Sequence, residues 1–353
     1  MIRQAYCSLE ALEEIHAFRD ELEYEALHQV LETHHRISVH LSDDDWDEQL
    51  GRNACLRYFV KRASSRNGYE LENTAEHCHD VMKNRTSTDL AGTVFIVDDE
   101  PAACARWREQ YGVCVVSRQA PAEASYLTQE LSRKEIRTAR SYRTSINGNE
   151  KLGWYAALSP RAPAWQAVPL NSLVIVDNYL LGEKSNRLEA GQENLISLLD
   201  ALLPATLYID FHLLLVTNNS NMFLTSQNLT QLAENLRRKL ARPYRLRIGV
   251  VTREDGREHR RAIVGNYYFG ASHHGFACFN GSEAQWPNDL VVSGLFSGIA
   301  AAGFDVPWVS MHDELRAVRI QRDRNRKPAN DNPNYLAINL AFGFCDNRLL
   351  ELV

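Results

Sequence analysis

The residues of this chain with the clearest chemical potential lie between positions 258 and 276. They include His259, Arg261 and Asn266, spaced as H-x-R-x4-N along one apparent strand. Because side chains alternate between the two faces of a strand, His259 and Arg261 are expected to share a face. An imidazole can attack or protonate a phosphodiester, and a guanidinium can bind its oxygens. The spacing therefore indicates a site that handles phosphate groups.

The same residues resemble the H-x-K-x4-D motif of the phospholipase D superfamily, with Arg261 in place of lysine and Asn266 in place of aspartate. The longer pattern H-x-R-x-I-x-x-N-Y, followed by H-G-F, is similar to a subgroup of that superfamily. This subgroup includes the C-terminal domain of a eukaryotic MIT-domain protein. The resemblance covers roughly residues 170 to 285, and the chain departs from the subgroup at Arg260 and Gly265.

The resemblance implies a phospholipase D-like fold and a set of site residues. His259 corresponds to the catalytic histidine. The phosphate-binding residues that it implies are Arg261, Asn266, Asp177 and His274.

The departures from the motif favour binding over turnover. Guanidinium is planar and permanently charged, and it suits bidentate phosphate binding, whereas Asn266 cannot supply a carboxylate. A phospholipase D active site pairs two such motifs, and this chain contains one copy. Three hypotheses stay open: phosphate recognition without chemistry, a homodimeric metal-independent phosphodiesterase or nuclease that pairs two His259 side chains, and a structural subunit without ligand.

Basic residues are concentrated in the same half of the chain. Residues 231 to 261 contain ten arginines or lysines and four acids, and arginines recur between 316 and 326. The net charge of -6 argues against a protein that coats nucleic acid, but a local cationic surface can still bind phosphates in a salt-dependent way. The alternative is a solvated helix end and loop. The residues predicted to bind nucleic acid are Arg237, Arg238, Lys239, Arg253, Arg257 and Arg260.

Two further clusters raise the question of a metal ion. Asp98 or Asp99 could join an acid at positions 43–45 around Mg²⁺, or the acids at 98–100 could cap a helix. The run E-H-C-H-D at 76–80 contains ligand-type side chains, but neighbours on a helix point in different directions and a second pair at zinc spacing is missing. We therefore expect a surface helix there, and neither a metal nor a cofactor.

Composition limits the class of protein. The chain of 353 residues with 44% hydrophobic residues is long enough for two domains. No apolar run approaches the roughly 18 residues of a membrane helix, and acidic residues interrupt the N-terminus where a signal peptide would be apolar. The seven scattered cysteines show no C-x-x-C spacing, which fits reduced thiols. A cytoplasmic protein without membrane contact is expected.

The pattern of elements predicts an α/β protein with two domains. Residues 1–158 form the first, with amphipathic helices at 8–34, polar loops at 63–92 and a βαβ unit at 93–117. The segment 159–170 contains three prolines and is interpreted as a linker.

Residues 171–353 form the second domain and its C-terminal extension. Its continuous apolar strands, joined by helices, predict a mixed sheet flanked by helices, in the order β-α-β-α-β-β-β. In this order the segment 259–269 is a single strand.

Motifs for P-loop nucleotide hydrolysis, dinucleotide redox chemistry, serine hydrolysis and zincin proteolysis are absent from the sequence. The classes that survive are a module that recognises phosphodiesters and a nuclease. We expect a prokaryotic accessory protein that recognises the phosphate groups of nucleic acid or a nucleotide. The resemblance to single-motif bacterial proteins implies a multi-protein system, such as phage defence. A protein partner or a homodimer is expected.

Overall fold

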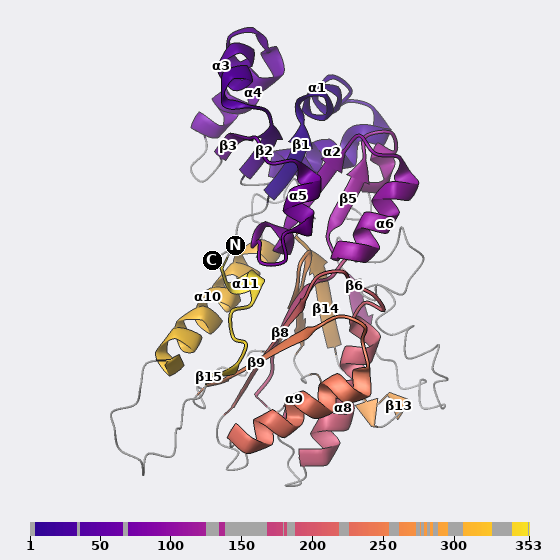
Figure 1. The fold of residues 1–353 in the computed structure, drawn as a ribbon, viewed down its shortest axis with the longest axis vertical. Helices are drawn as coiled ribbons and strands as arrows, with labels where there is room; N and C mark the ends of the chain where they lie inside the picture. Colours follow the sequence, from indigo (N-terminus) through magenta and orange to yellow (C-terminus); the bar gives the residue numbers. More distant parts are fainter. Residues whose placement is uncertain are drawn as a thin grey trace.

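The structure is a computed structural model with two large sheets, called here sheet A and sheet B, that follow each other along the long axis of the molecule (Figure 1). Sheet A is formed by residues 4–117 and sheet B by residues 134–343. The chain is therefore an α/β protein. The described residues are 4–33, 36–65, 70–124, 134–137, 168–178, 180–181, 188–218, 226–253, 261–272, 276, 279–280, 283–284, 289–295, 306–326, 341–351 and 353.

Sheet A has five parallel strands in the order β3-β2-β1-β4-β5. The strands are β1 (Gln4–Ser8), β2 (Arg36–His40), β3 (Glu70–Thr74), β4 (Thr93–Val97) and β5 (Cys114–Ser117). The connecting helices are α1 (Leu9–Ala17), α2 (Leu22–Thr33), α3 (Asp43–Arg52), α4 (Ala54–Ser65), α5 (Cys78–Lys83) and α6 (Pro101–Tyr111). Short 3-10 turns lie at η1 (Asp89–Ala91) and η2 (Pro121–Ala124).

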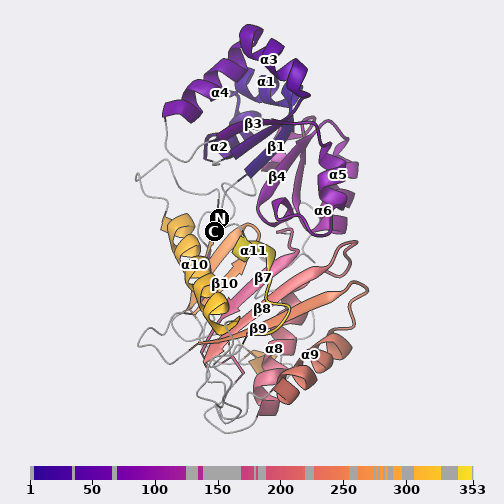
Figure 2. The ribbon, with the colours of Figure 1, turned by 60° about the vertical axis from the view of Figure 1, so that its left-hand side comes forward.

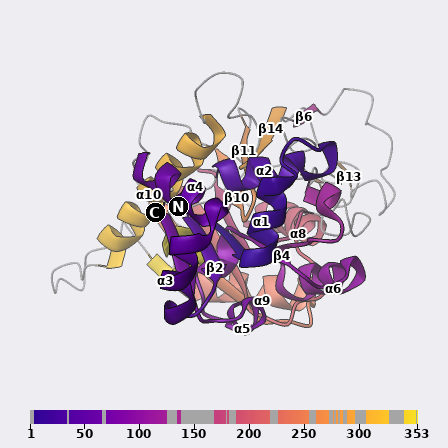
Figure 3. The ribbon, with the colours of Figure 1, turned by 90° about the horizontal axis from the view of Figure 1, so that it is seen from above.

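Helices cover both faces of sheet A. Figures 2 and 3 show α1 and α2 on one side of the strands and α5 and α6 on the other. Alternate residues of β1 accordingly belong to two separate apolar clusters, Ala5 and Cys7 to one and Tyr6 to the other. This two-sided burial explains why the central residues of β1, β4 and β5 are apolar on both faces.

The predicted βαβ unit is confirmed as β4-α6-β5. Pro101 begins α6, where its missing N–H costs nothing, and Gly112 ends it with a φ of 60°. The loops expected at 63–92 are wrong, because β3 and α5 lie there. The strand β3 is half-exposed at the sheet edge, so its sequence ELENT lacks the apolar pattern that marks a central strand.

Sheet B has eight strands in the order β15-β9-β8-β7-β10-β11-β14-β6. The parallel centre consists of β7 (Ser172–Val176), β8 (Phe211–Asn218) and β9 (Leu246–Arg253), connected through α8 (Leu188–Leu202) and α9 (Ser226–Leu240). The other strands are antiparallel to their neighbours: β6 (Lys134–Arg137), β10 (Ala262–Gly265), β11 (Tyr268–Ser272), β14 (Asp289–Gly294) and β15 (Ala341–Gly343).

The remaining elements complete this half of the molecule. The strands β12 (Phe279–Asn280) and β13 (Glu283–Ala284) pair only with each other among the described residues. In Figures 1 and 2 the strands of sheet B lie between α10 (Val306–Arg326) on one side and α8 and α9 on the other. The helix α11 (Arg348–Glu351) follows β15. The predicted mixed sheet with flanking helices is confirmed, whereas the domain boundary at 159–170 stays a prediction.

The expected single strand through Arg261 and Asn266 is wrong. The segment folds back as the hairpin β10-β11, in which Ala262 pairs with Ala271. Asn266 and Tyr267 connect the two strands. The two apolar stretches are separated by Gly265 and Asn266, a pair typical of hairpin turns, and both strands are buried in the sheet.

The turn of this hairpin joins the two halves of the molecule. The Asn266 Oδ1 atom accepts hydrogen bonds from the backbone N–H groups of Asn171 and Ser172, both at 3.0 Å, and its Nδ2 donates to the carbonyl of Leu90 at 3.0 Å. The Tyr267 hydroxyl donates to the Thr93 carbonyl at 2.6 Å. These bonds are fully buried, so the connection between sheets A and B is specific in geometry.

None of the helices in the described part of the chain combines the length and the apolarity needed to cross a membrane.

Candidate functional site

Several of the predicted site residues lie at the carboxyl edge of sheet B, where the parallel strands end. Asp177 follows β7, and Arg253 is the last residue of β9. Arg261 lies directly before β10, which runs antiparallel to β7, so it reaches the same edge. Ligands of α/β sheets commonly bind at the carboxyl ends of parallel strands. The structure therefore brings Asp177, Arg253 and Arg261 to one edge.

Both arginines at this edge lie beside buried carboxylates. Arg261 Nε is 3.6 Å from Asp177 Oδ1, and Arg253 Nη1 is 3.8 Å from Glu314 Oε1 on α10. Arg253 Nε also donates to Asn178 Oδ1 at 2.8 Å. Asp177 is 2% exposed and Glu314 4%, so each arginine lies at ion-pair distance from a carboxylate in the protein interior. These five residues are called the arginine edge below.

Asp177 also orders the chain around the arginine edge. Its Oδ2 atom accepts the backbone N–H of Phe276 at 2.8 Å. Phe276 directly follows the predicted H-H-G segment, whose His274 lies outside the described residues. Asp177 therefore contacts Arg261 and the backbone of Phe276 from the protein interior. It is too buried to bind a ligand directly.

Asn266 does not belong to the arginine edge. It is 0% exposed, and its amide is occupied by the junction bonds described above and by a bond from Nδ2 to Asn171 Oδ1 at 2.9 Å. The phosphate-binding role expected for Asn266 is corrected, because a fully bonded interior amide has nothing to offer a ligand. The remaining predicted residues His259, Arg257 and Arg260 lie outside the described residues.

The other predicted nucleic-acid-binding residues lie at the opposite end of β9. Arg237, Arg238 and Lys239 form the exposed last turn of α9, which leads into the start of that strand. Arg237 Nε donates to the Leu246 carbonyl at 3.2 Å. The strand β9 starts near this turn and ends at Arg253, so the basic residues form two groups at opposite ends of the strand.

A pocket of 610 Å³ lies where the amino edge of sheet B meets sheet A. Its lining includes Arg85, Tyr208, His212, Arg245, Arg247 and Arg348. Arg348 is 2% exposed and donates to the carbonyls of Asp210 and Arg85 at 2.9 and 2.5 Å. Burial lowers the pKa of Arg348 to about 10 and that of His212 to about 3, with neighbouring arginines also lowering the latter. This junction pocket is a second cationic region.

A second pocket, of 320 Å³, lies at the carboxyl edge of sheet A. Its lining includes Ser8, His40, His77, Cys78, His79 and Asp99, which follow or end β1 to β4. The strand order reverses between β1 and β4, and such a switch point is where α/β sheets commonly bind ligands.

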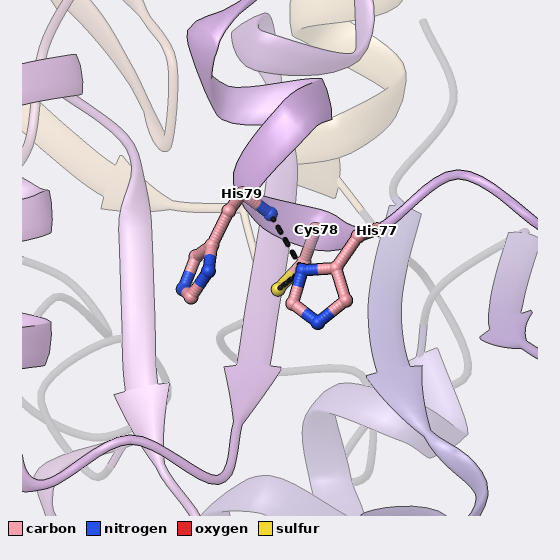
Figure 4. Close-up of side chains that lie close together, drawn as sticks. All are labelled: His77, Cys78 and His79. Atoms are coloured by element: carbon pink, nitrogen blue, oxygen red, sulfur yellow. Dashed lines mark hydrogen bonds between the residues drawn. The ribbon is translucent and has the colours of Figure 1, made fainter.

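Three adjacent residues of this pocket direct their side chains toward one another (Figure 4). One ligand-type atom each of His77, Cys78 and His79 lies within 4.8 Å of the other two. Cys78 Sγ is 3.8 Å from His77 Nδ1, and His79 Nε2 is 2.8 Å from Asp99 Oδ2. Burial raises the pKa of the Cys78 thiol to about 12, with Asp99 contributing.

On a regular helix, His77, Cys78 and His79 would point in different directions. His77 is instead the residue that caps α5, with an extended backbone (φ −72°, ψ 142°), and its ring folds back over the first turn. The run E-H-C-H-D was visible in the sequence, but the conformation that makes its side chains converge was not.

The alternative grouping of acids does not form. Asp98 is 2.7 Å from Arg118 in an ion pair, and Asp43 accepts a hydrogen bond from Asn73 at 2.6 Å. Asp98 and Asp99 line the pocket of sheet A, whereas its described lining includes none of the acids at 43–45.

No family model matches the chain, and no curated protein is similar to it in sequence.

Proposed function

We propose that this protein recognises phosphate groups of nucleic acid or a nucleotide at the arginine edge of sheet B. The observation that carries the proposal is the convergence of Arg253 and Arg261 at the ends of parallel strands, each beside a buried carboxylate. A buried carboxylate attracts the guanidinium beside it, and a guanidinium can bind a phosphate with two parallel hydrogen bonds.

The chain between these two residues supports the proposal. Both of its described ends, Arg253 and Arg261, lie at the same edge, and the sequence between them contains Arg257, His259 and Arg260. The nine residues 253–261 contain four arginines and a histidine against three acids, so the segment is rich in arginine and slightly cationic in a protein of net charge -6. The guanidinium groups gathered there can bind phosphate oxygens locally, even though the acids between them weaken the long-range attraction of a polyanion.

The position of Asn266 favours recognition over hydrolysis. In the resemblance to the phospholipase D superfamily, Asn266 stands where a supporting aspartate is expected, but its amide is part of the junction. The phospholipase D-like fold remains part of this proposal, and so does the accessory role in a prokaryotic multi-protein system such as phage defence. The rival is a homodimeric nuclease that uses His259.

Binding and cleavage of labelled single- and double-stranded DNA and RNA, measured at two salt concentrations with EDTA present, test the proposal. Wild type is expected to bind in a salt-dependent way without cleavage. Replacement Arg261→Ala should weaken binding by about 1–3 kcal/mol and reduce the salt slope by about one. The matched control is Arg238→Ala, which removes an exposed arginine at the far end of β9.

The alternatives give different results in the same assay. Cleavage that persists in EDTA and disappears in His259→Ala would establish the nuclease. Binding that is lost in Arg245→Ala and retained in Arg261→Ala would place the ligand in the junction pocket. Wild type that binds none of these nucleic acids, nor a labelled mononucleotide, would leave the structural subunit as the better account.

A further inference from the structure

We propose that His77, Cys78 and His79 bind a zinc-type transition-metal ion at the carboxyl edge of sheet A. This site is separate from the arginine edge and does not rest on the proposed function. Asp99 acts as a positioning residue that holds the His79 ring.

The donor set selects the class of metal. One thiol sulfur and two imidazole nitrogens suit borderline ions such as Zn²⁺, whereas Mg²⁺ and Ca²⁺ prefer oxygen ligands. Tetrahedral zinc, with bonds of about 2.0–2.3 Å, places neighbouring ligand atoms roughly 3.3–3.8 Å apart. Cys78 Sγ and His77 Nδ1 are already 3.8 Å apart, and the three atoms lie within 4.8 Å of one another. Side-chain movements of about one ångström would complete the geometry.

The His79 ring is held in place before any metal arrives. Its Nε2 is 2.8 Å from Asp99 Oδ2, and the ring stacks on Trp107 with centroids 4.5 Å apart and planes 22° apart. A carboxylate that accepts from one imidazole nitrogen leaves the other nitrogen as a ligand, and this arrangement is common around protein-bound zinc. Asp99 comes from the end of β4, so the sheet itself positions the ring.

His77 can change partner at little cost. Its Nδ1 accepts the backbone N–H of His79 at 3.4 Å, which is long for a hydrogen bond. A metal at this nitrogen would replace a weak bond with a strong one. Because His77 is exposed and caps α5 from outside the helix, its ring can shift without disturbing the core.

The three ligands face a cavity that other polar side chains share. The pocket of 320 Å³ is also lined by Ser8, Glu10 and His40, and the His40 ring lies 5.0 Å from that of His77. Three protein ligands with a position open to a cavity distinguish catalytic zinc sites from closed structural ones. The fourth position would therefore take water or a small ligand.

Cobalt titration of the full-length protein tests the proposal. After treatment with a chelator, wild type is expected to bind one equivalent of Co²⁺, with the charge-transfer absorption of a cobalt–thiolate bond, and Zn²⁺ should displace it. The change Cys78→Ser should abolish this absorption. The matched control is Cys345→Ser, since Cys345 is a buried cysteine of the sheet B half. Circular dichroism confirms that both variants fold.

The positioning residue has its own test. Replacement Asp99→Asn should weaken Zn²⁺ binding by roughly 10–100-fold, the range for partners of a metal-bound histidine. Cobalt–thiolate absorption that survives in Cys78→Ser, or wild type that shows none at one equivalent, would overturn the site. Equal Zn²⁺ affinity of wild type and Asp99→Asn would overturn the role of Asp99. These measurements contain no nucleic acid, so their outcome is independent of the arginine edge.

Discussion

The carboxyl edges of sheets A and B differ in what their polar side chains contact. At sheet A, His77, Cys78 and His79 turn toward one another and line a pocket. At sheet B, Asp177 and Glu314 are buried, and each lies beside an arginine. Parallel strands deliver polar side chains to both edges, but burial decides their use. An open cluster can take up an ion, whereas a buried acid serves to hold another side chain.

The junction between the sheets shows a third use of polar groups. Asn266 and Tyr267 come from the segment with the strongest motif, yet their side chains bond to the backbone of the sheet A half. Motif residues and structural residues can thus be neighbours in sequence. Stability measurements separate them, because a ligand-binding residue at the surface can be removed at little cost to the fold.

The largest expected effect is the loss of Asn266. In Asn266→Ala, two backbone N–H groups lose their buried acceptor, and the Leu90 carbonyl keeps only its bond from Asn171. We expect the free energy of unfolding to fall by about 3–5 kcal/mol, measured by urea denaturation. The matched change His77→Ala, at an exposed position beside the carboxyl edge of sheet A, removes only the long cap bond of 3.4 Å and should cost at most about 1 kcal/mol. Similar losses in both variants would erase the distinction between the junction and the sheet A edge.

The next effect concerns how closely the two halves approach. Gly112 has a φ of 60°, and a Cβ there would lie 2.3 Å from the Leu170 carbonyl oxygen, just before β7. The change Gly112→Ala should therefore cost about 2–4 kcal/mol, from left-handed backbone strain and the clash combined. Thermal unfolding checks this value. A loss of less than about 1 kcal/mol in the free energy of unfolding would contradict this prediction. It would mean that the two halves move apart easily to make room for the methyl group.

A smaller, pH-dependent effect is expected from His212 in the junction pocket. Burial is the main reason that the pKa of His212 falls from 6.5 to about 3. Between these two pH values, His212 is protonated in the unfolded chain and neutral in the folded one. The contribution of His212 to stability is full above pH 6.5 and falls by about 1.4 kcal/mol per pH unit toward pH 3. Urea unfolding at several pH values should show that the free energy of unfolding falls less per pH unit in His212→Gln than in wild type. An equal pH dependence in the two proteins would show that His212 takes up its proton in the folded chain as readily as in the unfolded chain.

The smallest expected effect is a gain in stability from a substitution in helix α3. Gly51 lies within α3, and a Cβ there would meet nothing within 4 Å. Replacement Gly51→Ala should raise the free energy of unfolding by about 0.5–1 kcal/mol, because glycine loses more backbone freedom in a helix. Replacement of glycine by alanine is thus expected to raise the free energy of unfolding at position 51 and to lower it at position 112. A loss at Gly51 would show that α3 makes contacts that depend on the glycine.

Local patterns predicted most elements of the fold. Uninterrupted apolar runs marked β4, β7 and β8, and Pro101 and Gly112 marked the ends of α6. The prediction missed β3, because an edge strand half-exposed to water needs no apolar pattern. The hairpin β10-β11 was also missed, although the pair Gly265-Asn266 between its two buried apolar runs is a turn signal.

The candidate sites were predicted less completely. The motif led to Arg261 and Asp177, which the structure places together, but it also led to Asn266, which is interior. The buried Glu314 comes from a helix more than fifty residues along the chain from Arg261, and no spacing rule connects the two. Ion pairs between distant segments depend on packing that local sequence does not record.

The sequence by itself determined an α/β protein, the βαβ unit at 93–117 and the cationic segment around Arg253 and Arg261, because hydrophobic period, caps and charge are local properties. Tertiary structure alone decided that Asn266 closes the junction and that His77, Cys78 and His79 converge beside Asp99. The physical reason is that burial and convergence arise from contacts between strands and helices far apart in the chain. The groups that pack around a side chain therefore decide whether it binds a ligand, caps a helix or connects two parts of the fold.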